Sequence, residues 1–183
     1  MADSSSIDSL LLVLQSQETH KERMGTLNQL ASDYLKTNPK ESYPYCLEVL
    51  LLDSEEPHPE ERGKALGILA EYYVYLGKFD SAKIHIDLAV EIAQELPDST
   101  HKMRIYSSAV GYALRMGEFE EVKAYANEGG RLAMELNHPG ARAVFANALG
   151  IVSDHTGKMD EAIFWYQTSK EEFARSGNLD GVN

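Results

Sequence analysis

The chain carries an internal repeat with a period of 40 residues. The segment Gly77-Lys-Phe-Asp-Ser-Ala is followed by segments with the same order of residue types that begin at Gly117 and at Gly157. Each copy contains glycine, a charged residue, a large apolar residue and then an acidic residue. Glycine favours the left-handed conformation that ends many helices, and acidic residues favour the first turn of a helix. The repeat therefore predicts a tight turn between two helices.

Apolar residues flank each turn at helical spacing. Leu66, Leu69 and Tyr73 precede the first glycine, while Ala82 and Ile86 follow it. Separations of three or four residues place such side chains on one face of a helix. No segment alternates between apolar and polar residues with the period of two that is typical of strands. We predict an all-α chain built from helical hairpins.

A weaker copy precedes these three, and its turn is one residue longer. In that turn, Asn38 is expected to take the left-handed role and Pro39 to open the next helix. Ahead of it, residues 7–14 form an apolar stripe that predicts a short capping helix, with Ser6 or Asp8 as its N-cap. The expected helices span about residues 7–17, 21–36, 40–53, 59–76, 79–96, 100–116, 119–136, 140–156 and 159–175.

These elements predict an α-solenoid, a right-handed superhelix of about four helix-turn-helix repeats behind an N-terminal capping helix. We expect one domain over 1–183, with a cap at 7–19 and repeats at about 21–55, 59–97, 99–137 and 139–177. No solvating helix follows the last repeat, so we expect the chain to be the N-terminal fragment of a longer protein.

The last helix is apolar on several sides at Ile163, Phe164 and Trp165. We expect some of these side chains to be exposed and to form an open-end interface, for example in a homodimer. The alternative is local packing against the preceding helix.

Composition restricts the class of partner. The 183 residues include 17 Lys and Arg against 29 Asp and Glu, which gives a formal net charge of −12. Binding to nucleic acid depends on clustered basic residues, so it is not expected. No apolar run is long enough to cross a membrane, and the N-terminus lacks the features of a signal peptide. We expect a cytoplasmic protein without membrane contact; a periplasmic location stays open if a signal sequence has been removed.

No catalytic, metal-binding or cofactor-binding constellation is evident, and no cofactor is expected. The six histidines show no metal-ligand spacing, and His58 and His138 both precede a proline at equivalent points of the repeat. Cys46, the single cysteine, falls on a buried stripe and is expected to be an inert core thiol.

The repeat resembles the tetratricopeptide repeat (TPR) family. The matching residues are Leu149-Gly150 and Tyr73 in first helices, Gly77, Gly117 and Gly157 at the turns, Phe79 and Phe119 after them, and Ala82, Ala89 and Ala162 in second helices. HEAT and armadillo repeats have a similar period but lack this turn. The resemblance implies a non-catalytic module that binds proteins or peptides.

Forty-residue variants of the repeat occur in kinesin light chains and in many bacterial signalling proteins, and the opening residues 7–34 are similar to the start of the bacterial arrays. That similarity implies a sensory or regulatory input region, followed beyond residue 183 by an output domain such as a kinase or cyclase. The alternative function is a structural scaffold or dimerisation array that acts through its open C-terminal end.

In the TPR family the first helices line a concave groove. Helix phase predicts that this groove contains Asn28, Lys36, Lys64, Glu71, Tyr75, Arg104, Ser108, Arg115, Asn147, Asp154 and His155. Four of these residues are basic, so the groove is expected to suit an acidic segment. The alternative is that these charges are solvated and offset by Glu71 and Asp154.

Two further features are expected to be structural. Arg23, Arg62, Lys102 and Arg142 recur at the start of each first helix, where their stems should cover the preceding second helix and their charges pair with acids such as Glu95. Gly129 and Gly130 lie in mid-helix, and close packing explains the first but not the second. We expect local flexibility there, visible as faster amide exchange.

Overall fold

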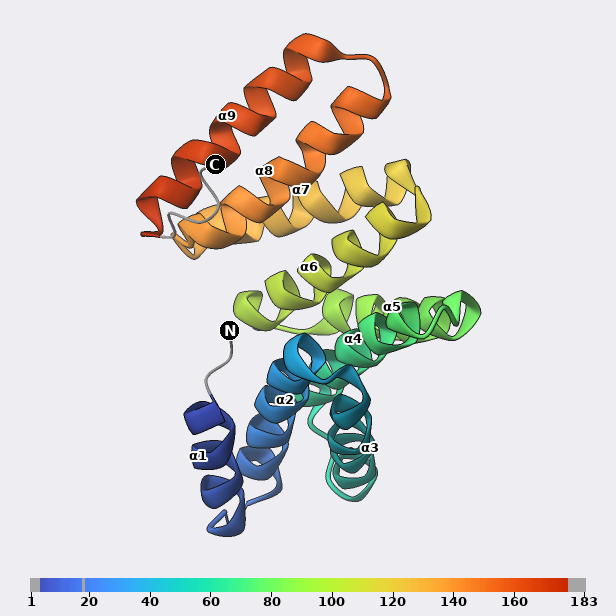
Figure 1. Cartoon of the computed structure of the whole chain (residues 1–183), viewed down its shortest axis with the longest axis vertical. Helices are drawn as coiled ribbons and strands as arrows, with labels where there is room; N and C mark the ends of the chain where they lie inside the picture. The colour runs from blue at the N-terminus through green and yellow to red at the C-terminus, as the bar shows by residue number, and fades with distance from the viewer. Residues whose placement is uncertain (1–3, 18, 178–183) are drawn as a thin grey trace. The chain divides into compact units, whose positions relative to one another are not determined.

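The computed structural model describes residues 4–17 and 19–177, and these ranges contain nine α-helices and no strand (Figure 1). The helices are α1 (Ser4–Gln15), α2 (His20–Thr37), α3 (Pro39–Glu55), α4 (Pro59–Tyr75), α5 (Phe79–Glu95), α6 (Ser99–Met116), α7 (Phe119–Glu135), α8 (Pro139–His155) and α9 (Met159–Arg175). The all-α prediction is confirmed, and each helix expected from the sequence is present. None of the described helices is both long enough and apolar enough to cross a membrane.

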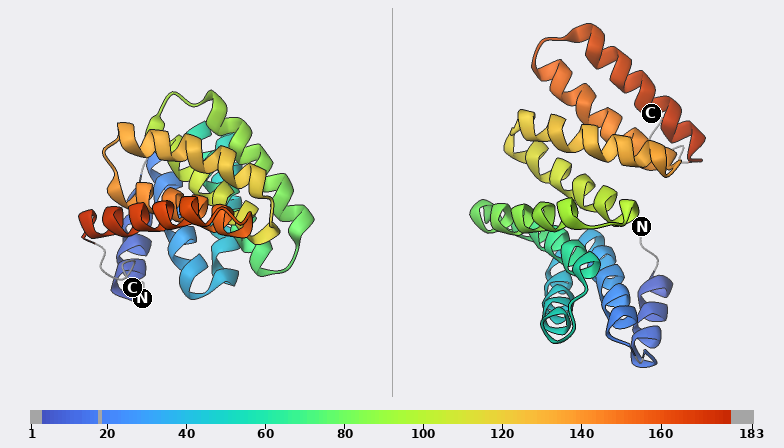
Figure 2. Two further views of the ribbon diagram at one scale, coloured as in Figure 1. Left: turned by 90° about the horizontal axis from the view of Figure 1, so that it is seen from above. Right: turned by 180° about the vertical axis from the view of Figure 1, so that it is seen from behind.

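The helices gather into two compact units, 1–96 and 97–183. In the first unit α1 packs on α2, which forms a hairpin with α3, and α4 packs on α3 and forms a hairpin with α5. In the second unit α6 pairs with α7 and α8 with α9, while α8 also packs on α7 and contacts α6 (Figure 2). The expectation of a single domain that begins a longer protein stays a prediction.

The three predicted turn glycines are left-handed. Gly77, Gly117 and Gly157 have φ angles of 70°, 72° and 72°. At each turn the following amide donates to a carbonyl five residues back, for example Glu118 N–H to Ala113 O at 2.9 Å. The glycine amide itself donates three residues back, as from Gly117 to Leu114 at 3.2 Å. This pair of bonds is the Schellman motif, which satisfies the last helical carbonyls.

The prediction for Asn38 is wrong. Its backbone lies at φ −144° and ψ 82°, outside the left-handed region. The next residue is Pro39, and a proline restricts the residue before it to extended conformations. The left-handed conformation is instead found at Asn137, with φ 48°, at the end of α7. There His138 N–H donates to Ala133 O at 2.9 Å, so the Schellman motif also ends this second helix.

The N-cap prediction for the first helix is also wrong. The described helix α1 begins at Ser4, so Ser6 and Asp8 lie inside it. The predicted starts of the later helices agree more closely, because Pro39, Pro59 and Pro139 each occupy a first helical position. Proline suits that position since its missing N–H would have no helical partner there.

Each unit has a core made by the predicted apolar stripes. In the first unit, fully buried side chains include Met24, Leu27, Cys46, Val49 and Leu69. In the second unit, Ile105, Val122, Phe145 and Val152 are at most 1 % exposed. Glycines in the stripes allow rings to reach the backbone: a Cβ added to Gly150 would lie 2.7 Å from the ring of Tyr166 on α9. Hairpin packing in the second unit therefore depends on aromatic–glycine contacts.

Candidate functional site

The residues predicted to line a groove all lie on the first helices of hairpins, but with different exposure. Exposed are Lys36, Tyr75, Arg104, Arg115, Asn147, Asp154 and His155; half-buried are Lys64, Glu71 and Ser108; buried is Asn28. The two units divide this set, with residues 28–75 in the first and residues 104–155 in the second.

In the first unit each of the two predicted groove lysines, Lys36 and Lys64, lies beside an acidic side chain. Lys64 Nζ donates to Glu61 Oε1 at 2.8 Å, and Asn28 Nδ2 donates to Glu61 Oε2 at 2.8 Å and to the Glu61 carbonyl at 3.0 Å. These contacts join α2 to α4 through a glutamate that is only 6 % exposed. Lys36 Nζ lies 3.7 Å from Asp33 Oδ1. Asn28 is therefore a structural link between helices, and Lys36 and Lys64 both have acidic partners on their own helices.

In the second unit, Arg104 and Arg115 are exposed, and neither forms a salt bridge with any residue that the structure describes. They lie eleven residues apart on α6, close to three full turns, so they project from the same face. Gly111 lies between them, and a Cβ added there would meet nothing within 4 Å. The "α6 face", defined as Arg104, Gly111 and Arg115 with the half-buried Ser107 and Ser108, is thus cationic at both ends and open in the middle.

The neighbouring helix α8 presents a less charged face at the same repeat positions. Val144 corresponds to Arg104 and is 39 % exposed, while Ile151, which corresponds to Gly111, is half-buried. His155 corresponds to Arg115, and its ring centroid lies 4.8 Å from that of Phe119. Val144 was not predicted as a site residue, although its position 40 residues after Arg104 indicates that it lies on the corresponding face of its helix.

Asp154 lies on the side of α8 that approaches α9. Burial and the Asp154 carboxylate together raise the pKa of Tyr166 on α9 above its ordinary value. Asn147 is exposed on α8, between Val144 and Ile151 in the sequence.

Three of the four basic residues predicted at the starts of first helices, all except Lys102, form ion pairs among the described residues, but not always with the expected helix. Arg62 lies 3.3 Å from Asp53 on the preceding second helix, as predicted. Arg23 instead reaches Glu48, and Arg142 reaches Glu172 at 3.0 Å, in both cases on the second helix of the same hairpin. Among the described contacts, Glu95 is not the partner of any of these cations.

The last helix exposes apolar side chains. Ile163 is 48 % and Phe164 58 % exposed, whereas Trp165 is half-buried and meets Phe164 edge-on, with ring centroids 5.0 Å apart. These three residues lie on α9, where the sequence predicts an open-end interface.

The described residues contain no group of three or more His, Cys, Asp or Glu side chains that could hold a metal ion. Cys46 is buried, and its desolvation raises the pKa of the thiol to about 12. His58 and His138 are the residues that immediately precede α4 and α8, and His138 Nδ1 accepts from Ala141 N–H at 3.1 Å.

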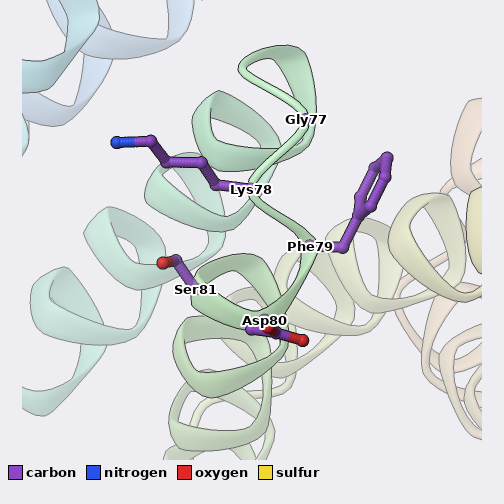
Figure 3. A pocket seen from close by; sticks show the side chains of 5 residues that line it. All are labelled: Gly77, Lys78, Phe79, Asp80 and Ser81. Carbon is purple, nitrogen blue, oxygen red and sulfur yellow. The ribbon is translucent and has the colours of Figure 1, made fainter.

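An open pocket of about 320 Å³ lies at the turn before α5, lined by Gly77, Lys78, Phe79, Asp80 and Ser81 (Figure 3). Its polar side chains are exposed or half-buried, and Lys78 and Phe79 point away from each other. The pocket is therefore a consequence of the turn and supplies no convergent set of ligand-binding groups.

Comparison with solved structures supports the predicted fold. BtubC (BKLC) from P. vanneervenii superposes with a TM-score of 0.72 and 16 % identity, covering 96 % of this chain and 74 % of that one. A crystal structure of the nearly identical TPR-like repeats of a Podosopora anserina putative kinesin light chain gives a TM-score of 0.61 and 16 % identity, covering 94 % and 88 %. A Q17M form of that protein gives 0.63 and 14 %, covering 95 % and 88 %.

No protein-family model matches the sequence, and no curated protein matches it either. The chain therefore has the TPR-like repeat fold, with little sequence identity to the structures that share it. TPR-like folds typically serve as non-catalytic scaffolds for protein–protein interaction.

Proposed function

We propose that this chain is a non-catalytic module that binds a protein or peptide on the exposed faces of its first helices. The observation that carries this proposal is the pair of exposed arginines on α6, which have no acidic partner among the described residues although acidic residues outnumber basic ones by 29 to 17. An arginine left exposed without a partner is available for charge-assisted hydrogen bonds to a carboxylate. The fold supports the same function, because TPR-like repeats generally mediate protein interaction.

The test is binding of a fluorescein-labelled peptide with two glutamates, followed by fluorescence anisotropy at low ionic strength. Arg104→Glu with Arg115→Glu should abolish binding. The charge-matched control is Lys21→Glu with Lys40→Glu, two exposed lysines on the first unit, which should retain it. Equal loss in both variants, or no binding to the wild type, would contradict the proposal.

A second candidate function is self-association through α9, in a scaffolding role. Its support is the exposure of Ile163 and Phe164 on the last described helix. Light scattering after size exclusion at several concentrations should then show a dimer that Phe164→Glu dissociates. Phe164 is the better choice than Trp165, which is half-buried and whose replacement would also disturb packing. A monomer at every concentration contradicts this candidate.

The finer proposal, an input region of a cytoplasmic bacterial signalling protein, rests on the resemblance of the repeat period and of residues 7–34. The native reading frame after Asn183 tests it, since it predicts an output domain there. A reading frame that encodes no such domain would contradict it.

A further inference from the structure

We infer that the α6 face recognises an extended acidic peptide whose two anionic groups lie six residues apart. This inference rests on the proposed function and adds the register of the ligand, which is the number of residues that separate its two anionic groups. It concerns the second unit alone, because both arginines, the glycine between them and the adjacent face of α8 belong to residues 97–183.

The helix fixes the distance between the two cationic residues of the α6 face. Arg104 and Arg115 are eleven residues apart on one continuous helix, α6 (Ser99–Met116). At a rise of about 1.5 Å per residue, their Cα atoms are separated by about 16 Å along the helix axis. An extended peptide advances about 3.3 Å per residue, and its side chains alternate between two faces. Two side chains that both face α6 are therefore an even number of residues apart. A spacing of six residues covers about 20 Å, a separation that the long, flexible arginine side chains can match.

The surface between the two arginines is uncharged and open. The space in front of Gly111 is open, since an added Cβ would meet nothing within 4 Å. Ser107 and Ser108 are half-buried beside it, and the α8 residue that corresponds to Gly111 in the repeat is the apolar, half-buried Ile151. This surface favours small or apolar residues between the two anionic groups of the peptide.

The four basic residues of the predicted groove differ in how available their charges are to a ligand. Among the four basic residues predicted to line the groove, Lys36 and Lys64 lie beside Asp33 and Glu61. Arg104 and Arg115 have no such partner among the described residues, so only these two have their full charge available to a ligand. The ligand charge is therefore expected to concentrate at two points rather than along the whole peptide.

The experiment compares capped peptides with two glutamates placed two, six or eleven positions apart in an otherwise neutral, alanine- and serine-rich sequence. The spacing of six should bind at least about threefold tighter than the spacing of two, because only it places both glutamates on one face at the separation of the two arginines. The spacing of eleven is the control for a helical ligand lying along α6. Added salt should weaken the preferred peptide most.

Single variants then assign each contact. Arg104→Gln and Arg115→Gln should each lower affinity for the peptide with a spacing of six. With a peptide that keeps only one glutamate, one of the two substitutions should no longer change the affinity. Both side chains are exposed, so circular dichroism should show unchanged helix content in each variant.

The outcomes separate the register from the proposed function. Equal affinity for all three spacings, or tightest binding at two or eleven, overturns the inferred register while acidic-peptide binding stands. Failure of every acidic peptide to bind overturns the proposed function, and the register with it.

Discussion

The ring of Phe145 lies directly against the backbone of Gly129, so that a Cβ placed on this glycine would come within 2.3 Å of the ring carbon Cζ. Phe145 is on α8 and Gly129 on α7, and both are buried. The contact explains why a helix interior tolerates a glycine, which ordinarily costs about 1 kcal/mol relative to alanine. It also links two successive hairpins of the second unit.

Gly129→Ala should destabilise the second unit by about 1–3 kcal/mol, because the added methyl group displaces the Phe145 ring. The neighbouring residue provides a matched control: a Cβ on Gly130 would lie 3.8 Å from Phe145 Cβ, an ordinary contact. Gly130→Ala should therefore stabilise the protein by up to about 1 kcal/mol. Urea unfolding measures both, and effects of the same sign would contradict the packing explanation.

Removal of the Asp98 cap should make α6 less stable at neutral pH. Asp98 Oδ1 accepts from His101 N–H at 2.8 Å and lies 2.6 Å from His101 Nδ1, and these contacts lower the pKa of the carboxyl below its ordinary value. A lowered carboxyl pKa means that the stabilisation is present above the usual pKa of aspartate and is lost as the pH falls through the lowered value.

Asp98→Ala should accordingly cost about 1 kcal/mol at pH 7. The difference between Asp98→Asn and wild type should shrink between pH 7 and pH 3, because asparagine keeps a capping oxygen but does not titrate. Urea unfolding at the two pH values checks this. A difference that stays constant with pH would rule out a contribution from the charge.

Glu172 is a buried carboxylate at a position where the preceding second helix carries the buried Leu132. It is 3 % exposed, its Oε1 lies 3.0 Å from Arg142 Nη2 in an ion pair, and the same oxygen accepts from Arg175 Nη1 at 2.9 Å. Arg142→Met alone should destabilise the protein by about 1–3 kcal/mol, because it leaves the carboxylate with one exposed partner. Adding Glu172→Leu should recover most of this loss, since an apolar pair often replaces a buried ion pair without cost. Additive losses in urea unfolding would contradict this account.

Cys46 should be unreactive in the folded chain. Its thiol is buried and its pKa is raised to about 12, so almost no thiolate is present at pH 8. A thiol reagent that absorbs on reaction should label the protein only in urea, with the midpoint of the first unit's unfolding. Rapid labelling without urea would show that α2, α3 and α4 open readily.

The sequence predicted the helices well because the 40-residue period repeats both turn glycines and apolar stripes. It failed where two local preferences competed. Asn38 favours a left-handed conformation, but the following proline restricts it more strongly. Asn137 has no proline after it and adopts that conformation. The identity of the next residue thus decides which asparagine ends a helix in this way.

The candidate site was predicted only in part, because helix phase gives the face of a residue but not its partner. Lys36 and Lys64 lie on first helices as expected, yet each has an acid three residues earlier, Asp33 and Glu61, which neutralises it. That spacing was readable in the sequence. The burial of Asn28 against Glu61 was not, because it depends on how closely α4 approaches α2.

Arg104 and Arg115 are the proposed binding groups, and because both are exposed they take little part in packing. Phe145 and Gly129 do the reverse, since they hold hairpins together and present nothing to a ligand. Under the proposed function, ligand preference and fold stability therefore depend on separate residues of the second unit, so that one can diverge while the other is preserved. A descendant of this chain with glutamates at positions 104 and 115 would keep its hairpins and select basic ligands instead, a change that leaves the repeat pattern in its sequence untouched.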